Sequence, residues 1–139
     1  GQVADLEGEG KKVSAAELRF IHERKTSALL RCAVRLGGMS ANCTPAELQA
    51  LSDFGYHVGL AFQVIDDILD VTQTSEQLGK TAGKDTAAQK ATFPSIVGMK
   101  RSQTIARQLT QKAYASLDRF GTRGATLRAL AAHLLERTH

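Results

Sequence analysis

Apolar residues recur along the chain at intervals of three and four, which is the period of an amphipathic helix. The longest stripe predicts a helix that begins after Thr44 and ends near 71–74. Its apolar members are Leu48, Leu51, Phe54, Val58, Phe62, Ile65 and Leu69. Thr44 is the expected N-cap, with Pro45 at the first helical position and Glu47 in the first turn.

A second stripe predicts a helix that begins after Ser14 and ends at Gly37-Gly38. Ser14 and Glu17 have the spacing of a capping box, which marks a helix N-terminus. Lys25 falls on the inward side of this helix. The other positions expected to face the core are Leu18, Ile21, Ala28, Leu29, Cys32 and Leu36.

The rest of the chain also reads as helices and connections. Residues 1–10 are typical of a helix end running into a glycine-rich loop, and 75–92 predict a polar loop. Further helices are expected over 94–99, 102–120 and 126–137. Because no segment alternates as a strand does, the prediction is an all-α fold, and the length of 139 residues fits a single domain.

Composition excludes several classes of protein. No apolar run reaches the roughly 18–20 residues of a membrane span. Two cysteines, Cys32 and Cys43, are too few for a disulfide framework, which favours an intracellular, cytoplasmic protein whose Cys32 is a buried apolar group.

Charge is unevenly divided along the chain. Residues 1–70 carry 7 basic and 10 acidic side chains, whereas 71–139 carry 11 and 4. A basic half suits an anionic ligand, either a phosphate compound or a nucleic acid. No nucleic-acid motif accompanies it, so we do not expect a nucleic-acid partner.

The strongest chemical signal is the segment Phe62-Gln63-Val64-Ile65-Asp66-Asp67-Ile68-Leu69-Asp70. Asp66 and Asp70 are four residues apart and share a helix face, whereas Asp67 is offset by about 100°. Clustered carboxylates repel one another unless a cation compensates, and carboxylate oxygens suit Mg²⁺. The alternative from the residues alone is a solvated acidic end of a helix.

Lysines supply the complementary charge. Lys25-Thr26 places an ammonium group on an apolar helix face, where it either reaches outward to water or binds an anion. Lys80, Lys84 and Lys90 follow the aspartates, the first two beside glycines that permit close approach to an oxyanion. A basic surface loop is the alternative for this stretch.

Five ordered blocks together resemble the trans-isoprenyl diphosphate synthases of the polyprenyl synthetase family. The blocks are Gly1-Gln2-x-x-Asp5-Leu6, Lys25-Thr26-x-Ala28-Leu29, the Gly59–Asp70 segment, Leu78-Gly79-Lys80 with Gly83-Lys84-Asp85, and Lys90-Ala91-Thr92-Phe93-Pro94. The third is similar to the family's second aspartate-rich motif. The resemblance implies a helical bundle of the isoprenoid synthase type, with 1–139 as the C-terminal part of one domain.

The resemblance also implies roles for individual residues. Asp66, Asp67 and Asp70 would bind Mg²⁺ on an allylic diphosphate, and Lys25, Lys80 and Lys90 would contact the diphosphate. The Thr26 carbonyl and the Gln63 amide would face an allylic cation. The reaction would be the condensation of isopentenyl diphosphate with an allylic diphosphate, yielding a farnesyl or geranylgeranyl product.

The family's first aspartate-rich motif is absent from this sequence. We therefore expect a missing N-terminal half of the fold and no prenyl transfer by these residues unaided. The resemblance also implies a homodimer. A different class of function stays open, namely a non-catalytic helical fragment or regulatory subunit that pairs with a partner synthase.

Overall fold

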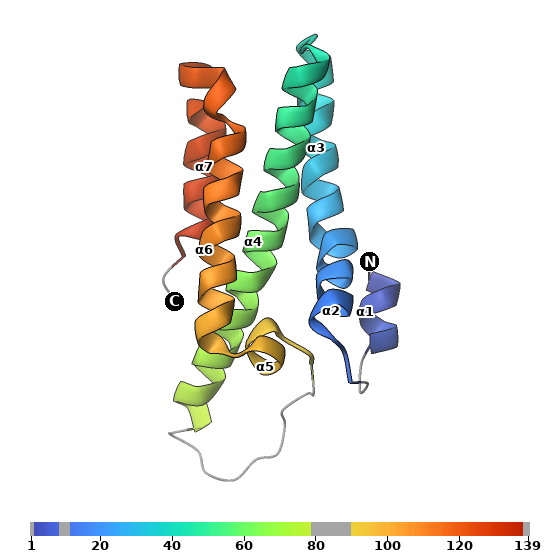
Figure 1. The fold of residues 1–139 in the computed structure, drawn as a ribbon, viewed down its shortest axis with the longest axis vertical. Coiled ribbons are helices and arrows are strands. Elements are labelled where there is room, and N and C mark those ends of the chain that lie inside the picture. Colours follow the sequence, from blue (N-terminus) through green and yellow to red (C-terminus); the bar gives the residue numbers. More distant parts are fainter. Residues whose placement is uncertain (1, 9–11, 79–89, 138–139) are drawn as a thin grey trace.

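The structure is a computed structural model that describes residues 2–8, 12–78 and 90–137. Every regular element within these ranges is helical, which confirms the all-α prediction (Figure 1). In chain order the elements are α1 (Gln2–Gly8), α2 (Ala15–His22), η1 (Glu23–Ser27), α3 (Ala28–Ser40), α4 (Pro45–Leu78), α5 (Phe93–Val97), α6 (Met99–Ser116), η2 (Asp118–Gly124) and α7 (Ala125–Leu135).

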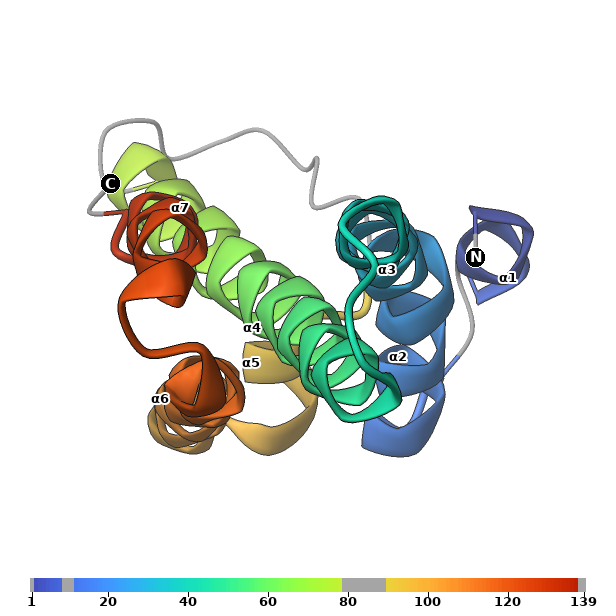
Figure 2. The same cartoon turned by 90° about the horizontal axis from the view of Figure 1, so that it is seen from above.

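The 34-residue helix α4 lies at the centre of the bundle. Viewed from above, α2, η1 and α3 lie on one side of α4, with α1 outside them, and α6 and α7 lie on the other side (Figure 2). The short helix α5 packs against α4, α2 and α6. Polar groups carried by α2, α4 and α5 are therefore brought to one region of the molecule.

A π-helical turn, η1, interrupts the helix predicted after Ser14. The Ala28 N–H donates to the Glu23 carbonyl, five residues earlier, so the turn holds one residue more than an α turn. The buried residues His22 and Ser27 accordingly lie five apart. Beyond the turn the inward face is displaced by about one residue, which an unbroken 3.6-residue period cannot predict.

The displacement overturns the predicted inward face of α3. Leu29 is 72% exposed and Leu36 56% exposed, and Cys32 is also exposed. The residues that pack against the core are Leu30 and Val34 instead. Upstream of the π turn the prediction is confirmed, because Leu18 and Ile21 are buried.

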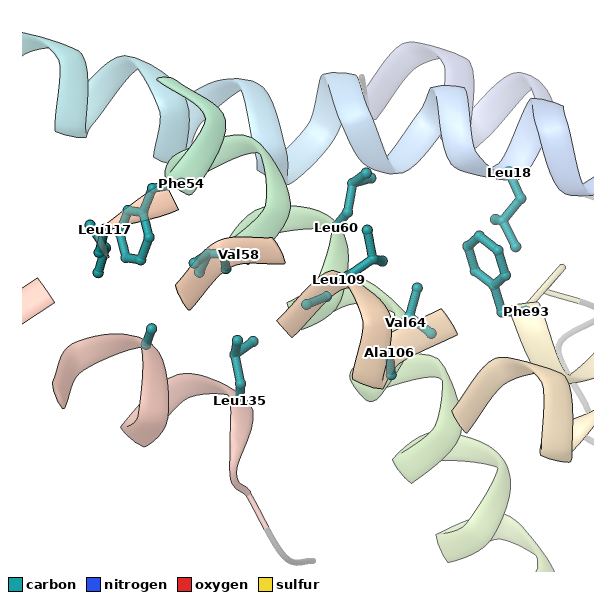
Figure 3. Close-up of a cluster of buried hydrophobic side chains, with 13 residues drawn as sticks. Leu18, Phe54, Val58, Leu60, Val64, Phe93, Ala106, Leu109, Leu117 and Leu135 are labelled. Carbon is teal, nitrogen blue, oxygen red and sulfur yellow. The ribbon is translucent and has the colours of Figure 1, made fainter. Parts of the chain in front are cut away.

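A single apolar cluster holds α4 to its neighbours. It brings Phe54, Val58, Leu60 and Val64 of α4 together with residues of α2, α5, α6 and α7 (Figure 3). Those partners are Leu18, Phe93, Ala106, Leu109, Ala113, Leu117, Ala131 and Leu135. This cluster fixes α4, and with it the aspartate-bearing segment.

On its other side α4 is held by close backbone contact. A Cβ at Gly59 would lie 2.4 Å from the Ser27 Cα, and one at Gly55 would lie 2.6 Å from the Arg31 Cα. These glycines therefore let η1 and α3 approach α4 more closely than any side chain would allow. The Ser27 hydroxyl adds a 2.8 Å hydrogen bond to the Tyr56 carbonyl.

The helix starts agree with the sequence better than the helix ends. Ser14 and Glu17 form the predicted capping box, and Thr44 and Glu47 pair in the same way. The helix α3 continues through Gly37-Gly38 to Ser40, and α4 continues to Leu78, so both predicted ends are wrong. No described helix is long and apolar enough to cross a membrane.

Candidate active site

The three aspartates lie within α4 and not at its end. Asp70 is about two turns before Leu78, and the helix dipole acts mainly within the last turn. The negative end of the dipole therefore adds little to the repulsion that the three carboxylates exert on one another. Asp66 is half-buried, Asp70 is exposed and Asp67 is 2% exposed. The segment thus presents two accessible carboxylates, four residues apart, and one buried carboxylate.

Asp67 is held by two neighbouring elements. Its Oδ2 accepts a hydrogen bond from the Phe93 backbone N–H at 3.0 Å and lies 3.2 Å from the His22 Nε2. The His22 ring also stacks on the Phe93 ring, with centroids 5.8 Å apart. Asp67 therefore connects α4 to both α2 and the start of α5.

Asp66 contacts the segment that follows α7. The Arg137 guanidinium donates to the Asp66 Oδ1 at 2.9 Å and lies 4.2 Å from the centre of the Phe62 ring. This pair is partly open to solvent, so the attraction is modest. An incoming cation could replace Arg137 at Asp66.

Lys25 and Thr26 lie in the π turn η1. The Lys25 side chain is 36% exposed and forms an ion pair with Asp5 of α1. Lys25 is thus neither buried nor free, because Asp5 directs its ammonium group. Single π turns within α-helices often occur at functional sites.

The π turn has its own polar support from α4. The Tyr56 hydroxyl donates to the Glu23 carboxylate and accepts from Arg19, while Arg19 also pairs with Glu23 at 3.2 Å. Hydrogen bonding to Tyr56 raises the pKa of Arg19 above its ordinary value. The start of the turn is therefore fixed against α4.

Lys90 lines a hollow together with Asp5, the partner of Lys25. Together with Asp5, Gly8, Val13, Ile21 and Ala91 it lines a small hollow between α1, α2 and the segment before α5. Asp5 is thus shared by the hollow and the Lys25 ion pair. Lys80 and Lys84 lie outside the described residues. Gln63 is half-buried on α4, one turn before Asp67.

Sequence reasoning did not assign three polar residues of this region. These are His22, which contacts Asp67, Arg137, which contacts Asp66, and Asp5, which enters the sequence argument only as part of a motif and pairs with Lys25. The proximity of His22 to Asp67 arises from helix packing across 45 positions, so no local pattern indicates it.

No group of three or more His, Cys, Asp or Glu side chains among the described residues forms a ready metal cage. Mg²⁺ does not require one, because it commonly uses one or two carboxylates with water and substrate phosphate oxygens. The accessible carboxylates of Asp66 and Asp70 therefore suit Mg²⁺ carried by a diphosphate.

Known proteins of similar sequence match nearly the whole chain. The family model described as polyprenyl synthetase matches residues 1–130. The dimethylallyltranstransferase of Fischerella ambigua is 46% identical over 140 residues, which cover 100% of this chain and 40% of the relative. The chloroplastic geranylgeranyl pyrophosphate synthase of Capsicum annuum is 45% identical, with 99% and 38% covered.

Solved structures agree in fold. A geranyltransferase from Helicobacter pylori, complexed with magnesium and isoprenyl diphosphate, is 32% identical with a TM-score of 0.71, over 97% of this chain and 44% of that one. An FPP/GFPP synthase from Zymomonas mobilis is 27% identical with a TM-score of 0.78, over 96% and 43%. The expected isoprenoid synthase type of bundle is thus confirmed, although this chain spans under half the length of these relatives. The chain belongs to the polyprenyl synthetase family.

Proposed function

We propose that this chain forms the diphosphate-binding portion of a trans-prenyltransferase, which condenses isopentenyl diphosphate with an allylic diphosphate. The observation that carries the proposal is that neighbouring residues connect Asp67 to Lys90, Asp5 and Lys25. Asp67 contacts Phe93, and Lys90 lies three residues before Phe93. Lys90 shares a hollow with Asp5, which pairs with Lys25. Carboxylates and lysines separated in the sequence are thereby gathered in one region.

The cofactor we propose is Mg²⁺, held by Asp66, Asp67 and Asp70 together with the substrate's diphosphate. Asp66 and Asp70 are the accessible members. Because the Asp67 Oδ2 is already engaged, any contribution of Asp67 would come through its other oxygen. When bound, the metal would neutralise charge on the diphosphate leaving group.

Lys25, Lys80 and Lys90 would hold the diphosphate as the bond between its oxygen and the allylic carbon breaks. The Thr26 carbonyl and the Gln63 amide oxygen would face the resulting allylic cation, and fixed dipoles of this kind stabilise developing charge. The double bond of isopentenyl diphosphate would attack this cation, and a proton would then pass to the departing diphosphate.

The partner we propose is an N-terminal half of the fold that covers the exposed side of α3. That side carries Leu29, Cys32, Leu36 and Met39, and the last three line one hollow. These exposed apolar groups are therefore adjacent to one another, whereas surface apolar residues without a partner are normally scattered singly. The relatives are more than twice as long as this chain, which supports the same partner. A homodimer and a cytoplasmic location stay predictions from the sequence.

The test is prenyl transfer by the protein in the length at which the cell makes it. Dimethylallyl and isopentenyl diphosphates are supplied with Mg²⁺. Asp66→Ala is expected to lower turnover at least about 100-fold, the scale of losing one electrostatic group at a reacting centre. Asp53→Ala is the matched control, because Asp53 is an exposed aspartate of the same helix.

Binding is measured alongside turnover. Mg²⁺ with inorganic diphosphate should raise the thermal stability of the wild type and not that of Asp66→Ala. Equal turnover in Asp66→Ala and Asp53→Ala would contradict the proposal. Binding without any turnover in the wild type would favour a non-catalytic subunit instead.

A further inference from the structure

The contacts of His22 are unlike those of a histidine that only fills space. His22 is 3% exposed and its Nε2 lies 3.2 Å from the Asp67 Oδ2, also buried. The carboxylate can only accept, so the Nε2 carries the proton and donates. The Nδ1 is buried without a hydrogen-bond partner among the described residues, so the one contact the ring makes as a donor is to Asp67.

The same oxygen of Asp67 also receives the Phe93 N–H at 3.0 Å. Phe93 is the first residue of α5, whose N-cap Thr92 forms a capping box with Ser95. The backbone at this point is therefore fixed from both sides, by the cap within α5 and by Asp67 across the helix packing. The stacked His22 and Phe93 rings add apolar contact.

Fixing Phe93 limits where Lys90 can lie. Three residues span at most about 10 Å of extended chain, so the Lys90 backbone stays within that distance of Phe93. Ile21, the neighbour of His22, lines the hollow that also contains Lys90 and Asp5. The same turn of α2 thus stacks on Phe93 at one end of this segment and shares a hollow with Lys90 at the other.

We infer that His22, Asp67 and the Phe93 N–H form a positioning unit that places Lys90 for binding diphosphate. The inference rests on the proposed function and adds His22 as a positioning residue. It also gives the buried Asp67 Oδ2 a role apart from the metal. Asp66 and Asp70 keep their accessible carboxylates under this assignment.

The experiment is a double-mutant cycle read out as the affinity for inorganic diphosphate at saturating Mg²⁺, measured by calorimetry on the naturally expressed protein. His22→Phe keeps an aromatic ring against Phe93 and removes the donor. Lys90→Ala removes the ammonium group. Each single variant should bind diphosphate about 10-fold more weakly, the scale of one charge-assisted hydrogen bond.

The effects of His22→Phe and Lys90→Ala on diphosphate affinity should not be independent if His22 positions Lys90. The double variant should bind diphosphate within about twofold of the affinity of Lys90→Ala. Once the Lys90 ammonium is absent, the loss of its positioning by His22 cannot weaken binding further. Multiplied effects, about 100-fold in the double variant, would overturn it, since His22 would then act independently of Lys90. The control His133→Phe makes the same change at an exposed histidine of α7 and should leave the affinity unchanged.

Further arms separate the possible failures. If His22→Phe does not fold, His22→Asn enters the same cycle, because its shorter amide cannot reach Asp67. His22→Gln retains a donor at nearly the Nε2 position and should recover affinity to within about threefold of the wild type. A wild type that binds no diphosphate would contradict the proposed function. A wild type that needs Lys90 but shows no coupling to His22 would contradict the positioning unit alone.

Discussion

The two sides of α4 are packed by different means. Toward α6 and α7 the contact is an apolar cluster of buried side chains such as Leu109, Ala113 and Leu117. Toward η1 and α3, Leu30 and Val34 also pack against this cluster, but the distinctive contact is close backbone approach at Gly55 and Gly59, with a hydrogen bond from the Ser27 hydroxyl. The first side provides stability, whereas the second sets the position of the turn that carries Lys25 and Thr26.

The largest difference in unfolding free energy is expected between replacing a buried leucine on one side and an exposed leucine on the other. Leu117 is 1% exposed, whereas Leu29 on α3 is 72% exposed. Leu117→Ala should lower the free energy of unfolding by about 2–5 kcal/mol, because it leaves a cavity in the cluster. Leu29→Ala should change it by less than about 0.5 kcal/mol.

Denaturant unfolding of both variants measures this difference. Equal losses would mean that Leu29 is covered in solution, and the proposed partner surface on α3 would then be occupied. The comparison therefore tests both the core and the exposed side of the helix.

The sequence predicted the first of these sides in part and the second badly. Leu51, Phe54 and Val58 of the predicted α4 stripe are buried, whereas Phe62, Ile65 and Leu69 are only half-buried. Leu60, Ala61 and Val64 take the core positions in that part of the helix. The α3 stripe failed because the π turn inserts a residue, and nothing in the composition of Glu23–Ser27 signals it. Its supports, Gly59 and Tyr56, are more than 25 positions away.

The candidate site follows the same division. Asp66, Asp70, Lys25 and Lys90 could be proposed as site residues because their motifs are local in the sequence. The pairing of Asp67 with His22 and of Lys25 with Asp5 could not be predicted. Both pairings depend on how helices cross, which a one-dimensional pattern does not contain.

The next largest effect should come from adding one carbon on the glycine side. Gly59→Ala places a Cβ 2.4 Å from the Ser27 Cα, so η1 or α4 must move. We expect a loss of about 1–3 kcal/mol in unfolding free energy, as for overpacking elsewhere, and weaker diphosphate binding because η1 carries Lys25.

Gly37→Ala is the matched control for this change. Gly37 lies in α3, and a Cβ there meets nothing within 4 Å. Alanine should stabilise the helix by about 0.5–1 kcal/mol. Stabilisation by both substitutions would show that the close approach at Gly59 is absent in solution.

A smaller effect is expected at the polar cluster of Tyr56, Glu23 and Arg19, which supports the π turn. Tyr56→Phe keeps the ring and removes the hydroxyl that joins Glu23 and Arg19. The loss should be about 0.5–1.5 kcal/mol in unfolding free energy. Tyr114→Phe serves as the control, because its hydroxyl makes one long contact of 3.4 Å with the exposed Glu136. An equal loss of unfolding free energy in both variants would show that the Tyr56 hydroxyl does not support η1.

The smallest effect concerns pH and His57, next to Tyr56 on α4. Burial is the main reason that the pKa of His57 is lowered, and Lys112 and Arg19 lower it further, while Asp53 opposes them. In the unfolded chain the group titrates near its ordinary value of about 6.5. The folded state therefore binds fewer protons, so stability is full above about pH 6.5 and is lost as pH falls through the lower folded pKa.

His57→Gln removes this contribution, and the difference in unfolding free energy between wild type and variant should shrink steadily from pH 7 to pH 5 in denaturant titrations. Parallel pH profiles for the two proteins would show that protonating His57 costs the fold nothing, and the His57 ring would then be more open to water than its burial indicates.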